Sequence, residues 1–266
     1  FINDDGTWKD MTKVKITTTD LSPTAAQMPR IMGLAMASKL FRENKYLSEF
    51  KILSNNGNEI VFGTIGDSST SEGIFWEAIN AMGVIQIPVV MSVWDDGHGI
   101  SVPVEMQTTK GSISKALQGL KKEADTNGIE IIVVDGWDYP ALCAAYHKAA
   151  NLAREKHIPV LVHVKELTQP QGHSTSGSHE RYKSKKRLAW EKEYDCVVQF
   201  TKWILENNWA TQKDLDAIHS ECKKAVRDAK NLAWKDYITP LKSDLSEVLS
   251  MIDAIASKSR SRAFIK

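Results

Sequence analysis

Four short apolar runs constrain the fold of this 266-residue chain more than any other feature. They occupy residues 59–65, 87–93, 129–135 and 158–164, are rich in Val and Ile, and have the length of buried strands. Segments of helical pattern separate the runs, and Asp138 is placed to cap the last of these helices. Because a strand–helix–strand connection sets its two strands parallel, the alternation predicts an α/β fold with a doubly wound parallel sheet.

The first connecting helix has its own start and stop signals. Ser69 followed by Glu72 fits a capping box, which predicts that the helix begins there. The helix should run to about Met82, and Gly83 stands where a glycine often ends a helix. A helix N-terminus at the carboxyl end of a strand offers free N–H groups to a phosphate, so this turn is a candidate binding site.

The chain changes character after the last apolar run. Residues 168–187 are rich in Ser, His and Lys, and we expect an exposed, mobile loop there. Helical periodicity then returns, and the expected helices cover about 191–207, 211–232 and 241–257. We therefore expect an α/β domain over residues 1–189, with its N-terminal part missing, and a helical appendage over residues 190–266.

Composition excludes several classes of partner. The 34 basic and 33 acidic residues give a net charge of +1, which provides no electrostatic case for nucleic acid or an anionic membrane. No apolar run is long enough for a transmembrane helix. The three cysteines form no Cys-x-x-Cys pair, which favours a reduced, cytoplasmic setting. The chain begins with Phe1 and shows no signal-peptide pattern, so we expect a piece of a longer polypeptide.

Two carboxylates follow consecutive apolar runs. Asp67 and Asp96 should emerge at the same edge of the sheet, and hydroxyls at Ser68 and Ser69 follow the first of them. Mg²⁺ favours one or two carboxylates together with substrate phosphates, so the pair predicts a magnesium seat. The alternatives are that Asp67 and Ser69 only cap a helix and that Asp96 belongs to a solvated acidic turn. An acid/base dyad is less favoured, because nothing nearby indicates a glycosidase or protease.

The segment IGDSSTSEGIFWEAINAMGVIQIPVVMSVWDDGHGISVP resembles the thiamine diphosphate signature of the α subunits of 2-oxo acid dehydrogenases. That signature reads Gly-Asp-Gly, Glu-Gly, Glu-Ala-x-Asn and finally Asn-Asn-x-Tyr-x-Ile-Ser, with the spacing that separates Asp67 from Asp96. Residues 133–168 are similar to the family's Val-Asp-Gly-Asn-Asp, helix, Pro-x-Leu-Ile-Glu stretch, and residues 172–184 to its His-Ser phosphate loop. Residues 22–40 and the helical tail also resemble the family, so nearly the whole chain is covered.

The resemblance implies a thiamine diphosphate-binding fold and a role for nine residues. Asp67 and Asp96 would bind Mg²⁺ through their side chains, and His98 through its backbone carbonyl. The residues implied to contact thiamine diphosphate are Ser22 and Thr24 at the aminopyrimidine, Gly66, Ser68 and Ser69 at the diphosphate, and His173 in the phosphate loop. His173 would also assist the reaction with the acyl acceptor, and Ser174 falls where some relatives are phosphorylated.

The chain departs from the family pattern near the phosphates. Ser68 replaces a glycine, and Asp95-Asp96 replaces Asn-Asn, which adds negative charge. Family arginines align with Trp94 and Gln169, and each lost charged hydrogen bond could weaken binding by about 1.5–3 kcal/mol. The candidate cations to replace them are Lys165, Arg181 and Lys183. His147, His157, His163 and His219 are expected to be structural or to lie on the surface, and no role is assigned to His179.

The resemblance implies the decarboxylating component of a 2-oxo acid dehydrogenase complex. It would use thiamine diphosphate and Mg²⁺ to decarboxylate a 2-oxo acid and to acylate a lipoyl group. The wording ISVP and HSTS favours branched-chain substrates, with pyruvate second and acetoin third. Its expected partners are a β subunit or β portion, which would supply a glutamate that this chain lacks, and a lipoyl-bearing acyltransferase component. The alternative, favoured by the charge changes, is a catalytically inactive structural or regulatory subunit.

Overall fold

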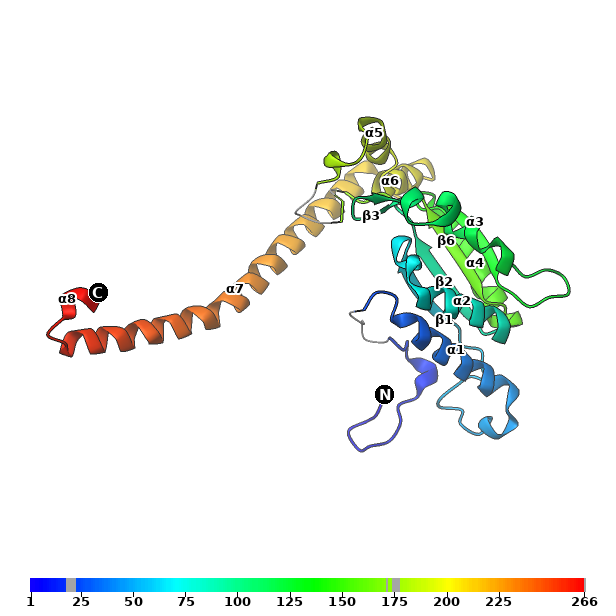
Figure 1. Cartoon of the computed structure of the whole chain (residues 1–266), viewed down its shortest axis with the longest axis horizontal. Helices are drawn as coiled ribbons and strands as arrows, with labels where there is room; N and C mark the ends of the chain where they lie inside the picture. Colours follow the sequence, from blue (N-terminus) through cyan, green and yellow to red (C-terminus); the bar gives the residue numbers. More distant parts are fainter. Residues whose placement is uncertain (18–22, 171, 174–177, 266) are drawn as a thin grey trace. The chain divides into compact units, whose positions relative to one another are not determined.

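The computed structural model describes residues 1–17, 23–170, 172–173 and 178–265. It divides into two compact units, Phe1–Lys202 and Trp203–Lys266. The first unit holds every strand, together with helices α1 to α5 and the first part of α6 (Figure 1). The second unit contains the rest of α6 and two further helices. The domain boundary that we expect at residues 189 and 190 stays a prediction.

A four-stranded parallel sheet forms the centre of the first unit. Its strands are β1 (Val61–Gly66), β2 (Val89–Trp94), β5 (Glu130–Asp135) and β6 (Val160–Lys165), in the order β1-β2-β6-β5 (Figure 1). Each lies within two residues of an apolar run that predicted it. A separate antiparallel pair, β3 (His98–Gly99) and β4 (Val102–Pro103), follows β2. The α/β prediction is confirmed.

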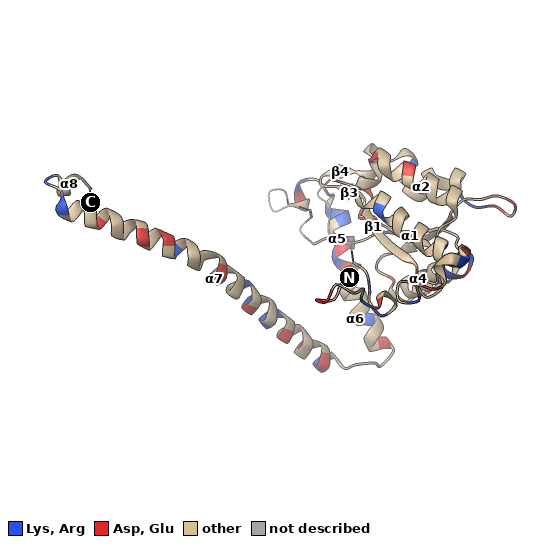
Figure 2. Cartoon of the chain, turned by 90° about the horizontal axis from the view of Figure 1, so that it is seen from below, with Lys and Arg blue, Asp and Glu red and all other residues tan. Residues whose placement is uncertain are grey.

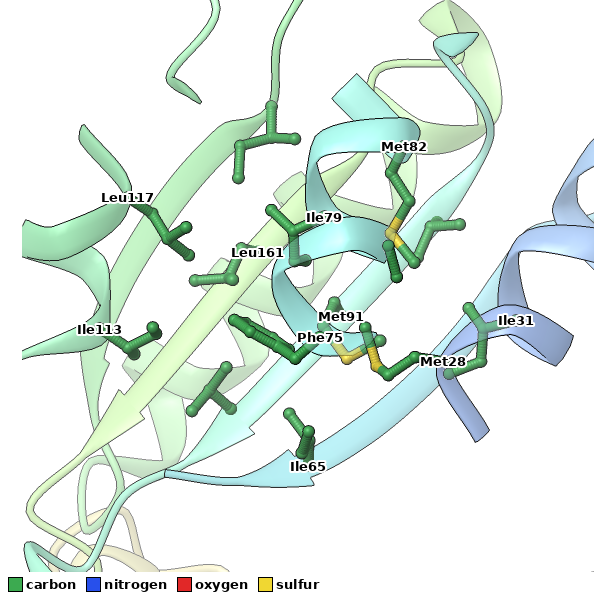
Figure 3. Close-up of a cluster of buried hydrophobic side chains, with 14 of the residues drawn as sticks. Met28, Ile31, Ile65, Phe75, Ile79, Met82, Met91, Ile113, Leu117 and Leu161 are labelled. Atoms are coloured by element: carbon green, nitrogen blue, oxygen red, sulfur yellow. The ribbon is translucent and has the colours of Figure 1, made fainter. Parts of the chain in front are cut away.

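One face of the sheet is covered by α1 (Gln27–Glu43), α2 (Gly73–Ile85) and the short α3 (Ile113–Ala116). Figure 3 shows Phe75 and Ile79 of α2 and Met28 of α1 pointing into one cluster above the strands. Gly63 of β1 permits this approach. A Cβ built on Gly63 would lie 2.3 Å from Ile31 Cδ1, so a larger residue there would require the end of the Ile31 side chain to move.

The other face is covered by α4 (Tyr139–Lys156). Alanines at Ala145, Ala149 and Ala153 recur every four residues along this helix and pack against strand valines. The Asp138 carboxylate accepts a hydrogen bond from the backbone N–H of Ala141, at 2.9 Å, so the predicted cap is present. Helices therefore lie on both faces, as the doubly wound prediction requires.

The predicted start and end of α2 are wrong. Residues Ser68–Ser71 form a 3-10 helix, and α2 begins only at Gly73, without a side-chain cap. The tight turn forms because the backbone N–H and hydroxyl of Thr70 both donate to the carbonyl of Asp67. The helix ends at Ile85, so Gly83 is not its stop. Instead, the carbonyl of Gly83 accepts a hydrogen bond from the N–H of Gly128 at 3.2 Å.

The C-terminal helices are α5 (Lys185–Glu193), α6 (Cys196–Glu206), α7 (Gln212–Lys258) and α8 (Arg262–Ile265). Two separate helices were predicted where α7 runs without a break. Pro240 removes one backbone donor but does not end the helix. A capping box between Thr211 and Asp214 fixes its start. Figure 2 shows charged residues of both signs along α7.

The segment 183–187, predicted as an exposed loop, contains a buried ion pair. The side chain of Lys183 is 1% exposed, and its ammonium lies 2.8 Å from Glu191 Oε1. Arg187 donates to the same oxygen and to Glu166, which ties α5 to the residue that follows β6. These ion pairs therefore fix the conformation of residues 183–187, which were expected to form a mobile loop. Within the described residues, no helix is long and apolar enough to cross a membrane.

Candidate functional site

The carboxyl ends of β1 and β2 lie side by side. Gly66 pairs with Trp94 in the sheet register, and the backbone N–H of Asp67 donates to the carbonyl of Trp94 at 3.0 Å. Asp67 and the doublet Asp95-Asp96 therefore leave the sheet at the same edge, as the spacing predicted. In open α/β sheets this edge is where ligands bind.

The three carboxylates are all buried, but their hydrogen bonding differs. Asp95 has a partner at each oxygen: Oδ1 accepts from the N–H of Gly97 at 2.8 Å, and Oδ2 contacts His163 Nε2 at 2.7 Å. Asp96 Oδ1 accepts from the N–H of His98 at 3.2 Å. Asp96 Oδ2 and Asp67 Oδ2 have no hydrogen-bond partner among the described residues. Two buried carboxylate oxygens are thus left for a ligand.

The electrostatics of Asp67 fit a cation. Burial, and after it the negative charges of Asp95 and Asp96, together raise the pKa of Asp67 to about 7. Like charges this close in a buried site are unfavourable unless a cation neutralises them. Among the described residues, no group of three His, Cys, Asp or Glu side chains could hold a metal by itself. A metal here would therefore use the two carboxylates together with backbone or ligand oxygens.

Two residues of the phosphate loop, His173 and Tyr182, lie against the turn that carries Asp96 and His98. His173 Nδ1 is 3.7 Å from Asp96 Oδ2, and the side chain of His173 is 32% exposed. The ring of Tyr182 packs against that of His98, with centroids 5.4 Å apart. Burial, with the nearby charge of Asp96, raises the pKa of Tyr182, so its phenol stays neutral. The loop histidine and the doublet thus lie close together, and the role of His173 stays a prediction.

The proposed diphosphate residues surround the end of β1. Ser68 lies against the β3 turn, where a Cβ built on Gly99 would be 2.6 Å from that of Ser68. Ser69 follows in the same 3-10 helix, and its hydroxyl is the nearest group to a Cβ built on Gly66, at 3.9 Å. The hydroxyl of Ser69 is thus the nearest neighbour on the Cβ side of Gly66, and it lies no closer than an ordinary van der Waals contact.

The proposed aminopyrimidine residues precede α1. Thr24 lies in an exposed turn just before that helix. Gln27 Nε2 donates to the carbonyl of Thr64 at 3.0 Å, which holds the start of α1 beside the end of β1. Ser22 lies outside the described residues, as does Ser174.

The candidate replacement cations are engaged elsewhere. Lys165 Nζ lies 2.7 Å from Asp135, and Lys183 is buried against Glu191. Gln169, which stands at a family arginine position, donates to the carbonyl of Gly172 at 3.3 Å. The described contacts thus give Lys165 and Lys183 carboxylate partners of their own.

His163 is the functional candidate that sequence reasoning missed. It was expected to be structural or exposed, but its side chain is 2% exposed and contacts Asp95. The register pairs His163 with Val93, two residues before Asp95 on the neighbouring strand. The available signal was a single ionisable residue inside an otherwise apolar run.

The fold and the site define a class: an α/β protein with buried carboxylates at the carboxyl edge of a parallel sheet. A family model described as dehydrogenase E1 component matches residues 5–241. The chain belongs to this family, whose members generally depend on thiamine diphosphate.

Two curated relatives illustrate the similarity. The pyruvate dehydrogenase E1 component subunit alpha of Rickettsia bellii is 29% identical over 204 residues, covering 77% of this chain and 56% of the relative. The 2-oxoisovalerate dehydrogenase subunit alpha 1, mitochondrial, of Arabidopsis thaliana is 28% identical over 232 residues, covering 85% of this chain and 44% of the relative. The expected resemblance to α subunits is thereby confirmed. The chain spans about half the length of these relatives.

Proposed function

We propose that this chain is the α part of the decarboxylating component of a 2-oxo acid dehydrogenase complex. The observation that carries the proposal is the pair of buried, unpartnered oxygens on Asp67 and Asp96 at adjacent strand ends. Mg²⁺ accepts carboxylate oxygens together with phosphate oxygens, so this pair fits a magnesium-bound diphosphate. Family membership supplies the diphosphate ligand, thiamine diphosphate.

The proposed roles follow the resemblance to the family, residue by residue. Asp67 and Asp96 hold Mg²⁺ through their side chains, and His98 holds it through its backbone carbonyl. Ser68 and Ser69, with Gly66, face the diphosphate, and Ser22 and Thr24 contact the aminopyrimidine. When bound, thiamine diphosphate supplies the nucleophilic carbon and the electron sink for decarboxylation.

His173 is the proposed catalytic residue of this chain. Its ring is partly exposed and lies near Asp96, so it can hold or move a proton beside the cofactor site. The Asp96 carboxylate lies near Nδ1 of the ring without a hydrogen bond to it, and the proposal gives the ring the task of proton transfer to or from the acyl acceptor. That acceptor is proposed to be a lipoyl group on a partner acyltransferase component.

The proposed substrate is a branched-chain 2-oxo acid, with pyruvate and acetoin as alternatives. The names of the two relatives given above contain pyruvate and 2-oxoisovalerate, so the experiment compares both classes of substrate. Decarboxylation of 3-methyl-2-oxobutanoate and of pyruvate, each with a dye acceptor, ranks them. A faster reaction with pyruvate would overturn the branched-chain assignment.

The proposed assembly includes a β subunit or β portion that completes the active site. Apolar side chains exposed along α7 support a protein partner; they include Leu232, Trp234, Leu241, Leu245 and Ile255. The three cysteines are free, which supports a reducing, cytoplasmic setting.

Calorimetric titration of the complete assembly with thiamine diphosphate, with and without Mg²⁺, tests the metal site. We expect Mg²⁺-dependent binding, and Asp96→Ala should weaken it at least about tenfold because one carboxylate ligand is lost. Glu72→Ala, which removes an exposed carboxylate beside the same turn, should leave the affinity unchanged. Unchanged affinity in the Asp96 variant removes this residue from the ligand set.

A catalytically inactive structural or regulatory subunit is the second candidate. It is favoured by one observation: Lys165 and Lys183, which could have replaced the family's phosphate-binding cations, are paired with carboxylates. An assembly that binds no thiamine diphosphate at millimolar concentration with excess Mg²⁺ would establish this candidate and refute the enzyme.

A further inference from the structure

Three buried polar side chains form a hydrogen-bonded line that ends at Asp95, beside the proposed metal ligand Asp96. Ser114 Oγ, on α3, lies 2.8 Å from His163 Nδ1, and His163 Nε2, on β6, lies 2.7 Å from Asp95 Oδ2. The three residues are 5%, 2% and 8% exposed, respectively. Both ring nitrogens are satisfied, so the imidazole is held from two sides in one orientation.

A hydrolytic role for this line is excluded by burial. A Ser-His-Asp arrangement catalyses acyl transfer only where the hydroxyl meets a substrate. The hydroxyl of Ser114 is covered, and it lies 3.2 Å from a second hydroxyl, that of Ser112. The line can therefore act only on Asp95.

Hydrogen bonds hold both the side chain and the backbone of Asp95. Its side chain bonds to Gly97 and His163, its backbone N–H donates to Val164 at 2.9 Å, and its carbonyl accepts from Leu167 at 3.0 Å. Asp67 and Asp96 differ from it in that each keeps one buried oxygen without a hydrogen-bond partner. The structure thus separates one anchored carboxylate from two available ones.

We propose that His163 is a positioning residue that withdraws Asp95 from the metal site, so that the ion meets two carboxylates instead of three. This inference rests on the proposed function. His163 also occupies the glutamate position of the Pro-x-Leu-Ile-Glu pattern, and Asp95 occupies an asparagine position. The two departures from the family pattern are therefore hydrogen-bonded to each other.

The consequence concerns metal preference. Mg²⁺ requires a small octahedral shell that keeps few carboxylates, whereas Ca²⁺ takes six to eight oxygens and tolerates more of them. Releasing Asp95 would add a third carboxylate to the site. The affinity for Ca²⁺ relative to Mg²⁺ should therefore rise when His163 loses its donor.

The experiment measures thiamine diphosphate binding to the complete assembly with Mg²⁺ and, separately, with Ca²⁺. His163→Leu should raise the Ca²⁺-to-Mg²⁺ affinity ratio about tenfold, and His163→Gln, which keeps a donor, should restore it. The double variant Asp95→Asn, His163→Leu should also return the ratio to the wild-type value. His157→Asn, at another buried histidine, is the matched control.

Each result supports or overturns the positioning role of His163. A folded His163→Leu variant with an unchanged ratio overturns the positioning role while the proposed function stands. A wild-type assembly that shows no metal-dependent binding overturns both. If His163→Leu does not fold, Ser114→Ala replaces it in the experiment. This variant removes only the hydrogen-bond partner of His163 Nδ1, the ring nitrogen that does not contact Asp95. A raised ratio supports the anchoring line, and an unchanged ratio overturns it.

Discussion

Replacing Asp67 with Asn should stabilise the metal-free protein while removing its response to Mg²⁺. Burial and the charges of Asp95 and Asp96 raise the pKa of Asp67 from 3.8 to about 7. Below about pH 4 the carboxyl is protonated in both folded and unfolded chains, so it costs nothing; above about pH 7 it is ionised in both, and the full cost applies. The free energy of unfolding contributed by Asp67 therefore falls as the pH rises between these values.

The magnitude follows from the size of the shift. A shift of this size sets an upper bound of about 4 kcal/mol, and solvent screening at the partly open strand edge reduces it to about 2 kcal/mol. Asn has nearly the same shape and no charge. Asp67→Asn should therefore raise the free energy of unfolding by about 2 kcal/mol at about pH 8 and by almost nothing at about pH 4.

The assay is urea unfolding in the presence of a chelator, followed by tryptophan fluorescence at both pH values. Repeating it with excess Mg²⁺ and thiamine diphosphate should stabilise the wild type by about 2.7 kcal/mol at a hundred times the dissociation constant, and the variant far less. Glu72→Gln alters an exposed carboxylate five residues along the chain and is the control. It should change neither the free energy of unfolding nor the stabilisation by Mg²⁺ and thiamine diphosphate. An equal gain in stability at both pH values would refute the electrostatic reasoning, because a packing effect does not depend on pH.

Two further predictions concern stability. Phe75→Ala should lower the free energy of unfolding by about 3–5 kcal/mol, because Phe75 is fully buried between α1, α2 and the sheet. Glu191→Gln should lower it by about 3 kcal/mol, because the buried ammonium of Lys183 then lacks a counter-charge. Chemical denaturation measures both.

Each has a control on its own helix. Val84→Ala removes a side chain of α2 that is 61% exposed, and it should change stability by less than about 0.5 kcal/mol. Glu193→Gln alters an exposed carboxylate of α5 and should likewise have little effect. A Phe75 variant no weaker than its control would contradict the core assignment. Similarly, a Glu191 variant as stable as wild type would show that Lys183 finds another partner or reaches solvent.

The strands could be predicted because each is specified locally. An apolar run of Val and Ile between polar residues favours a buried strand wherever the chain places it, and the connections then force the strands parallel. The Asp67 and Asp96 pair followed directly, because the ends of adjacent parallel strands meet at one edge. These parts of the site needed no knowledge of distant contacts.

The errors arose where distant contacts or competing local bonds decide. Ser69 and Glu72 match a capping box, but the bonds from Thr70 to Asp67 tighten the turn and delay the helix. Two helices were expected over about 211–232 and 241–257, where α7 is continuous. His163 meets Asp95 only because β6 inserts between β2 and β5, which periodicity alone cannot reveal.

Helix α7 has a consequence for how this protein unfolds. At 47 residues it is about 70 Å long, and most of its apolar side chains are exposed to solvent in the described chain. Such a helix is held mainly by its own hydrogen bonds, so its melting is not tied to that of the sheet core. Heating should then give two transitions, the first of which moves with the concentration of any subunit that covers the helix. A single melting temperature would not describe this chain.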